Sequence, residues 1–176
     1  MKVIQWTLAV VGILALAILG AGLFLPSRFE VARSAVINAP AERVYDLIAD
    51  PRHWAKWSVW NQRDPDMDIK YSGPPFGQGA KWSWKSKSEG SGNMVFTRVE
   101  PNSRIAYALS FPELGMKSGG AFALEAAASG TKVTWTNAGD VGPNPLKHYL
   151  AVMMDRMVGP DFEAGLANLK ALAEKP

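Results

Sequence analysis

An uncharged apolar run near the N-terminus constrains this chain more than any other feature of its sequence. Val3–Leu25 holds 18 apolar residues, three glycines, Gln5 and Thr7 in 23 positions. At a rise of about 1.5 Å per residue, a helix of this length crosses a hydrocarbon core about 30 Å thick. We therefore predict a transmembrane anchor over residues 1–26, followed by one soluble domain over residues 27–176.

A cleaved signal peptide is the competing interpretation of the same run. Its apolar region usually spans about 7–15 residues before a small-x-small cleavage site. Here the run is longer, and Leu23–Leu25 follow the only plausible cleavage zone at Gly20–Gly22, so we favour an uncleaved anchor. Lys2 on one side and Arg28 and Arg33 on the other do not decide the orientation by the positive-inside rule. The short leading tail favours a single-pass protein of the inner (cytoplasmic) membrane with its domain on the outer, periplasmic side.

Charge and cysteine content exclude several classes of protein. The formal net charge is only +3, from 19 Lys and Arg against 16 Asp and Glu. The longest basic cluster is Lys81, Lys85 and Lys87, which is sparse for a nucleic-acid surface. The chain has no cysteine, which removes disulfides, thiolate nucleophiles and cysteine-based metal sites. We expect no nucleic-acid partner and no cofactor, and the oligomeric state stays open.

The domain begins with a strand and two helices. Apolar residues alternate over Phe29–Asn38, which predicts a strand. An i, i+3, i+4 apolar spacing predicts a helix over Pro40–Asp50, and tryptophans at every third position predict a short helix over His53–Trp60. The remaining strands are then expected at Met67–Tyr71, Ala80–Ser86, Met94–Val99, Ile105–Phe111, Ala121–Ala127 and Lys132–Ala138.

Turn signals separate these strands, and a helical pattern ends the chain. Loops are expected at Glu89–Gly92 and Pro112–Gly119. Helical spacing begins at Leu146, and the Gly159-Pro160 pair predicts a kink or break within that helix. Strands joined by short turns pair antiparallel, and the long C-terminal helix is the obvious cover for one face of the sheet. The predicted class is α+β.

The order of several motifs resembles a known superfamily. They are the run Phe29–Asp50, the Trp54-x-x-Trp57-Ser58-x-Trp60 segment, Tyr71–Pro74 and Gly77-x-Gly79-Ala80. Together they resemble the START / polyketide cyclase-dehydrase (SRPBCC) superfamily over residues 29–175. The resemblance implies the helix-grip fold, a curved antiparallel sheet of about seven strands around a long C-terminal helix. It also implies a hydrophobic ligand between sheet and helix, and some members cyclise or dehydrate polyketides.

Aromatic and methionine residues are the best functional clue within the domain. The candidate ligand-binding residues are Trp57, Trp60, Trp82, Trp84, Tyr107, Trp135, Met153 and Met157. Ligand sites are mostly apolar and aromatic with a few placed polar groups, and methionine adapts to varied shapes. Possible polar members are Arg98, Arg104, Tyr107, Glu125 and Asn137. A filled core demands the same apolar residues, so the sequence leaves a cavity and a solid interior as alternatives.

Catalytic and metal-binding signals are weak. Tyr107, Glu125 and His148 are the candidate general acids or bases. Asp64, Asp66 and Asp68 have the spacing of a calcium loop, but Ile69 and Pro75 stand where that loop needs Gly and Glu. We therefore predict no metal site.

Three functions remain in competition. The first is a membrane-anchored binding module for a hydrophobic or lipid-like small molecule. The second is a polyketide cyclase/dehydrase-like enzyme that uses a pocket acid or base. The third is a packed, partner-binding domain without a ligand.

Overall fold

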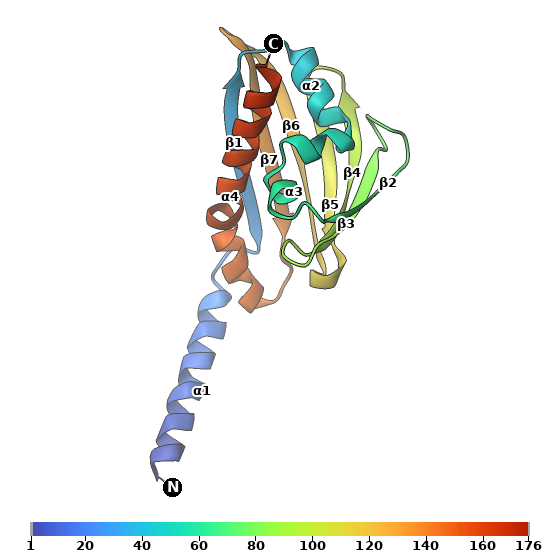
Figure 1. Cartoon of the computed structure of the whole chain (residues 1–176). Coiled ribbons are helices and arrows are strands. Elements are labelled where there is room, and N and C mark those ends of the chain that lie inside the picture. The colour runs from blue at the N-terminus through green and yellow to red at the C-terminus, as the bar shows by residue number, and fades with distance from the viewer. Residues whose placement is uncertain (1, 176) are drawn as a thin grey trace.

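The computed structural model describes residues 2–175; residues 1 and 176, at the outer limits of the predicted anchor and domain, lie outside the described part (Figure 1). The elements are α1 (Lys2–Gly22), β1 (Arg28–Ile37), α2 (Ala41–Ala49), η1 (Pro51–Lys56), α3 (Val59–Arg63), β2 (Asp68–Ser72), β3 (Lys81–Lys85), β4 (Ser91–Glu100), β5 (Arg104–Phe111), η2 (Pro112–Leu114), β6 (Met116–Ala127), β7 (Gly130–Asp140) and α4 (Pro145–Ala173). The seven strands form one antiparallel sheet in the order β1-β7-β6-β5-β4-β3-β2.

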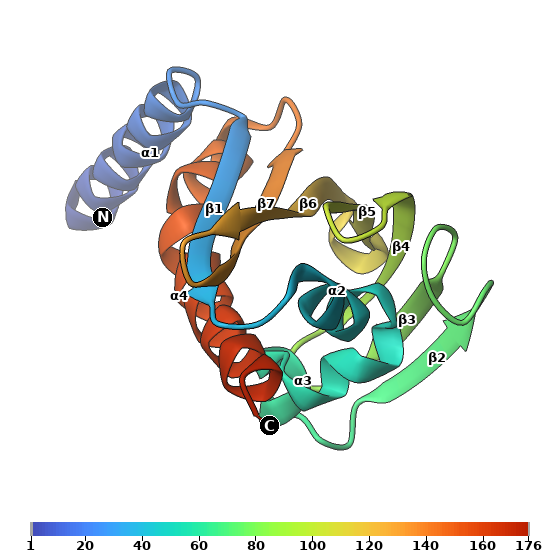
Figure 2. The ribbon, with the colours of Figure 1, turned by 90° about the horizontal axis from the view of Figure 1, so that it is seen from above.

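The sheet curves around the helices in the arrangement of a helix-grip fold. Seen from above, the strands enclose a concave face with α4 along one side and α2, η1 and α3 across part of it (Figure 2). The first strand, β1, pairs antiparallel with the last strand, β7, so strands from the two ends of the domain lie side by side. The predicted α+β class and the predicted sheet around a long C-terminal helix are confirmed.

Two strands, β6 and β4, start three or more residues earlier than the sequence pattern predicts. β6 begins at Met116, so the second half of the expected Pro112–Gly119 loop is strand, paired from Phe111–Met116 onward, and η2 occupies Pro112–Leu114. The reason is that Lys117–Gly120 carries no apolar alternation, yet its backbone pairs with β5 and β7 on either side. β4 likewise begins at Ser91 rather than Met94, which shortens the expected Glu89–Gly92 loop.

α4 continues through the Gly159-Pro160 pair, so the predicted break does not occur. The helix is held to the sheet near this point by Arg33 on β1. The Arg33 guanidinium donates hydrogen bonds to Asp155 at 2.7 Å and Glu163 at 2.6 Å. These contacts, on both sides of the proline, hold the helix against β1 where one backbone hydrogen bond is lost.

The concave face has two ends that differ in their contents. At the end beneath α2 and η1, which we call the closed end, the interior is solid. Trp57 is fully buried there, its ring 4.7 Å from Trp54 and 6.1 Å from Phe122. At the other end, which we call the open end, lie the β5–β6 turn, the β3–β4 loop and the linker before α4 (Figure 1).

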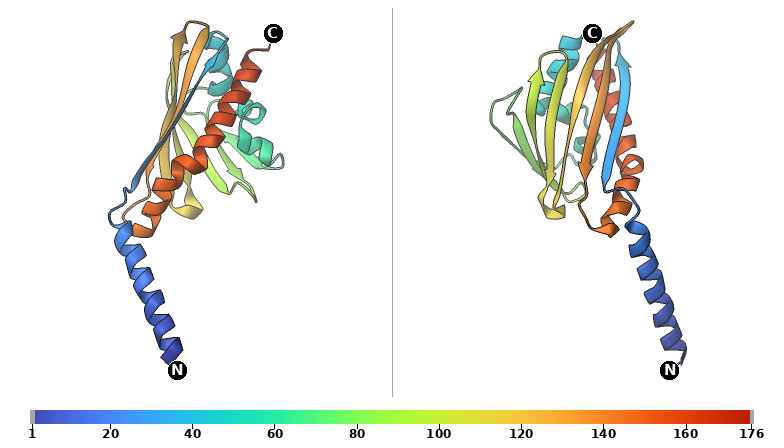
Figure 3. Two further views of the ribbon diagram at one scale, coloured as in Figure 1. Left: turned by 90° about the vertical axis from the view of Figure 1, so that its left-hand side faces the viewer. Right: turned by 180° about the vertical axis from the view of Figure 1, so that it is seen from behind.

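α1 projects from the open end as a separate rod (Figure 3). It is long and apolar enough to cross a membrane, and none of its apolar core is buried against the domain. Only its last turns touch the domain, where Gly22 is buried against the start of α4.

Candidate functional site

The open end of the concave face contains a cavity of about 340 Å³ between the sheet and α4. Its wall is built mostly from apolar side chains of β3 to β7, α3, η2 and α4. The volume falls within the range of about 300–1,000 Å³ typical of small-molecule sites. The interior of this domain is therefore solid at one end and hollow at the other.

Tyr107 and Trp135 form a hydrogen-bonded wall between the solid and hollow parts. The Trp135 indole N–H donates to the Tyr107 hydroxyl at 3.0 Å, and that hydroxyl donates to the Thr136 carbonyl at 2.8 Å. The Tyr107 ring packs over β6 to reach the Thr136 carbonyl on β7, and it can do so only because the β6 residue beneath it is Gly120. A Cβ at that position would overlap the Thr136 carbonyl oxygen and the Tyr107 hydroxyl.

Asn137 is the polar residue of the cavity wall that lacks a partner. Its side chain is 7% exposed, and its Oδ1 accepts no hydrogen bond from any residue between 2 and 175. A buried acceptor left without a donor costs about 1–3 kcal/mol. The cavity therefore presents one acceptor that a hydroxyl or N–H group of a bound molecule would satisfy.

Six of the eight predicted ligand-binding residues line the cavity: Trp60, Trp82, Trp84, Tyr107, Trp135 and Met157. The other two lie elsewhere. Trp57 belongs to the closed end, where its indole N–H donates to the Leu47 carbonyl at 3.0 Å. Met153 faces outward and is 53% exposed, because the neighbouring Met154 occupies the inward position on α4. That these residues bind a ligand stays a prediction.

Several lining residues were missed by the sequence reasoning. Met94, Leu109 and Phe111 lie on inward strand positions, and their alternation with outward residues was the available signal. Met67 and Met116 stand beside turns, where no periodicity indicates direction.

The three candidate acid or base residues do not converge. Tyr107 lines the cavity, but burial raises its pKa well above the ordinary value, and its hydroxyl is already engaged twice. Glu125 is exposed on the outer face of β6, 3.6 Å from Lys132. His148 lies at the junction with α1, with Nδ1 2.8 Å from the Gly22 carbonyl and Nε2 3.1 Å from the Gly142 carbonyl.

The other polar candidates also lie outside the cavity. Arg98 and Arg104 are exposed, and Arg98 pairs with Glu100 at 2.8 Å. Asp64, from the calcium-like spacing, accepts hydrogen bonds from Ser86 and from the Asp66 backbone. Within residues 2–175, no group of three or more His, Asp or Glu side chains is placed to hold a metal ion.

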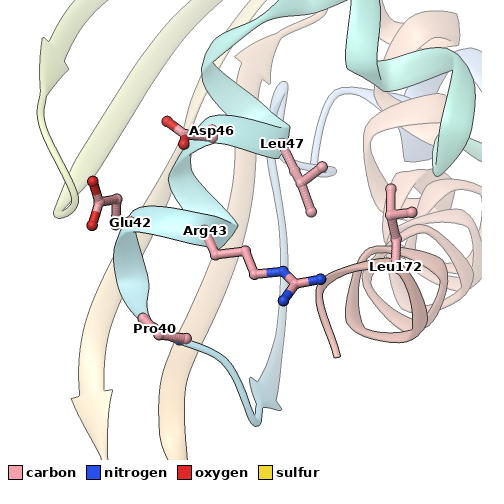
Figure 4. A pocket seen from close by; sticks show the side chains of 6 residues that line it. All are labelled: Pro40, Glu42, Arg43, Asp46, Leu47 and Leu172. Atoms are coloured by element: carbon pink, nitrogen blue, oxygen red, sulfur yellow. The ribbon is translucent and has the colours of Figure 1, made fainter. Parts of the chain in front are cut away.

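A second hollow lies on the surface between α2 and the end of α4 (Figure 4). Its volume is larger, about 450 Å³, but only six residues line it. Arg43 reaches across it and donates to the Lys175 carbonyl, while Glu42 and Asp46 are exposed at its rim. Because it is shallow and largely open to solvent, it lacks the enclosure of a ligand site, so we take the cavity at the open end as the candidate site.

Comparison with known proteins agrees with the fold. A family model described as polyketide cyclase/dehydrase and lipid transport matches residues 28–174, which confirms the resemblance to the SRPBCC superfamily. No curated protein matches the sequence.

Solved structures with similar folds share little sequence with this chain. A protein from Chromobacterium violaceum is 20% identical with a TM-score of 0.60, over 84% of this chain and 98% of its own. The Aha1 dimer from Colwellia psychrerythraea is 19% identical with a TM-score of 0.57, over 82% of this chain and 96% of its own. The di-domain ARO/CYC StfQ of the steffimycin biosynthetic pathway is 14% identical with a TM-score of 0.64, over 84% of this chain and 51% of its own. At these identities the likeness concerns the fold, which hosts many functions.

Proposed function

Since the chain belongs to the polyketide cyclase/dehydrase and lipid transport family, we propose that it is a membrane-anchored module that binds a hydrophobic or lipid-like small molecule. The observation that carries this proposal is the cavity of about 340 Å³ with its aromatic and methionine wall. Burial of apolar surface contributes about 25 cal/mol per Å², so a chain-like apolar molecule gains most of its affinity from such a wall.

The proposed ligand has an apolar body and at least one hydrogen-bond donor. The body would fill the space among Trp84, Leu109 and Met154, which all line the cavity. The donor would reach Asn137 Oδ1, the buried acceptor without a partner in the described chain. An alcohol, a protonated acid or an amide meets both requirements.

The anchor in this proposal is α1. Its length and composition are those of a membrane-spanning helix, and its last turn is joined to the domain rather than to a long linker. We propose a single-pass protein of the cytoplasmic membrane, with the domain on the periplasmic side.

An enzyme of the cyclase type is the second candidate, favoured by the ARO/CYC neighbour in fold. It has less support from the cavity itself. Tyr107 is the one proposed acid or base that lines it, and both hydrogen bonds of its hydroxyl are directed into the wall. A binding role needs no group with a tuned pKa, whereas general acid–base catalysis does.

Binding can be tested with the full chain in nanodiscs and cis-parinaric acid as the fluorescent ligand. Energy transfer from the wall tryptophans to the bound polyene should saturate, and unlabelled hexadecanol should displace it. Trp84→Ala should weaken binding, whereas Trp6→Ala in α1 serves as a matched tryptophan control outside the cavity. Energy transfer that rises linearly without saturation, and equally in both variants, would reflect partition into lipid and would contradict the proposal.

A further inference from the structure

The mouth of the cavity lies at the end of the domain from which α1 emerges. Leu114 in the β5–β6 turn lines the cavity and is 60% exposed to solvent. Lys117, three residues later, also lines the cavity and is exposed to solvent. Trp54 and Trp82 line the inner part and are buried. The β5–β6 turn and the α1–α4 junction occupy the same end of the molecule (Figure 1).

The junction between α1 and the domain is held by direct contacts. Gly22 packs so closely on Pro145 that a Cβ would stand 2.5 Å from the Pro145 carbonyl oxygen. The Tyr149 hydroxyl donates to the Ile18 carbonyl at 2.7 Å. Ile18 and Gly22 lie one turn apart on the same face of α1, and this face packs along α4. The direction of α1 therefore fixes which end of the domain meets the bilayer.

The same end exposes apolar side chains that continue the surface of α1. Phe24 is 91% exposed, and Leu23 and Leu146 are also largely exposed. Leu114 adds a further apolar side chain from a segment distant in sequence. Clustered exposed apolar residues mark an interaction site, and here they adjoin a helix whose own apolar surface needs lipid.

Basic side chains also lie at this end of the domain. Four lysines at the open end form no ion pair with any described residue: Lys85, Lys87, Lys117 and Lys147. Acids also lie at this end: Asp140 is 3.6 Å from Arg28, Glu89 is 3.7 Å from Arg63, Asp64 accepts a hydrogen bond from Ser86, and Asp68 stands opposite Lys85 in the sheet. The basic groups next to the exposed apolar side chains are therefore Lys117, close to Leu114, and Lys147, beside Leu146. Lysines beside a membrane helix are attracted to anionic lipid headgroups.

We infer that the open end rests on the bilayer that holds α1, with Leu23, Phe24 and the Pro112–Lys117 turn among the lipid headgroups. The cavity mouth then opens onto the membrane, so that the ligand passes between bilayer and cavity without crossing bulk water. The partner of this surface is a phospholipid bilayer containing anionic lipid. This inference rests on the proposed anchor and on the proposed ligand binding. The contact of the open end with the bilayer can nevertheless be measured without measuring ligand binding.

The docking geometry can be read with a single fluorescent label, since the chain has no cysteine. Leu114→Cys places an NBD group in the β5–β6 turn. The matched control is Phe76→Cys, in the β2–β3 loop beside the closed end, where the parent side chain is 64% exposed. In nanodiscs of phosphatidylcholine and phosphatidylglycerol with a headgroup-level spin-labelled lipid, the label at position 114 should be quenched severalfold more than the label at position 76. Equal quenching, or none at either position, would overturn the inference.

The route of the ligand is tested with a pair of phenylalanine variants outside the cavity wall. Phe24→Asp places a charge at the proposed contact with lipid, and Phe76→Asp places one in the control loop. Passage of cis-parinaric acid into the cavity from the bilayer that holds the chain is followed by tryptophan energy transfer, in phosphatidylcholine–phosphatidylglycerol nanodiscs preloaded with the polyene and released from hexadecanol by dilution. This passage should slow severalfold in Phe24→Asp alone. Equilibrium binding should be equal in both variants. Equal rates of passage with intact binding would overturn the inference, whereas absent binding in the parent chain would instead overturn the proposed function.

Discussion

The closed and open ends of the concave face share one sheet and one helix, yet only one of them is solid. At the closed end, Trp54 of η1 and Trp57, the residue that follows η1, fill the space between the sheet and α4. At the open end, α3 contributes Trp60 and Asn61 to the cavity wall without filling the cavity, and β6 contributes the small residue Ser118. The difference shows that covering elements and small residues, rather than the number of aromatic residues, decide whether this fold packs or stays hollow.

Removing a tryptophan from each end should give the largest contrast in stability. Trp57→Ala deletes a fully buried ring and the hydrogen bond to Leu47, so the free energy of unfolding should fall by about 3–5 kcal/mol. Trp84→Ala removes a half-buried ring from the cavity wall, and its effect on stability should be clearly smaller. Thermal unfolding in nanodiscs measures both. Equal losses would show that the open end is packed like the closed end.

Enlarging a side chain should have opposite consequences at the two ends. Leu109→Trp fills part of the cavity and should lower the affinity for cis-parinaric acid at least tenfold, or about 1.4 kcal/mol, with little loss of stability. Leu166→Trp, at a buried position of α4, should instead destabilise the domain by about 1–3 kcal/mol through overpacking. A destabilised Leu109→Trp that still binds the ligand normally would contradict the cavity assignment.

Two asparagines allow a sharper test, because the Asn168 side chain is hydrogen-bonded within the chain and Asn137 Oδ1 is a buried acceptor without a partner among the described residues. Asn137→Leu removes the unpartnered acceptor of the cavity, so stability should rise by about 1 kcal/mol while the preference for hexadecanol over its methyl ether disappears. Asn168 donates to the Trp57 carbonyl and to Gln62, both at 3.1 Å, so Asn168→Leu should lower stability. A Tm that falls in both variants would show that Asn137 is satisfied within the protein.

The smallest expected effect concerns the ion pair that attaches α4 between the two ends. The hydrogen bond from Arg33 lowers the pKa of Asp155 below its ordinary value, so this carboxylate stabilises the folded state at neutral pH. That contribution is lost as the pH falls from about 4 through the lowered pKa. Because the pair is exposed, the change should be slight. The Tm difference between the parent chain and Arg33→Met should narrow on acidification. A constant difference from neutral pH to the acid range would exclude this linkage.

Much of the fold follows from local pattern. Alternating residues such as Val31 and Val133 face the core, and the helical spacing of Phe162, Leu166 and Leu169 places α4 on the sheet. The strand start at Met116 could not be read this way, because glycines and polar residues carry no period. Pairing on both sides determines that segment.

The candidate site was less accessible to sequence reasoning than the fold. Tryptophans of the packed core and of the cavity, such as Trp57 and Trp84, look alike in a sequence. Their difference depends on which element covers each of them, and that is a tertiary property. Met153 and Met154 differ by about 100° around α4, too little for composition to separate the outward residue from the inward one.

The central claim, a hollow open end that takes up a hydrophobic molecule, can be tested most directly through the methionine methyl groups. Five methionines line the cavity: Met67, Met94, Met116, Met154 and Met157. Met153 faces outward beside them and is an internal control. In isotope-labelled full chain in nanodiscs, saturation with hexadecanol should shift the methyl signals of the cavity group and leave Met153 in place. Unchanged cavity signals at saturation, or a shift at Met153 as large as theirs, would contradict the account.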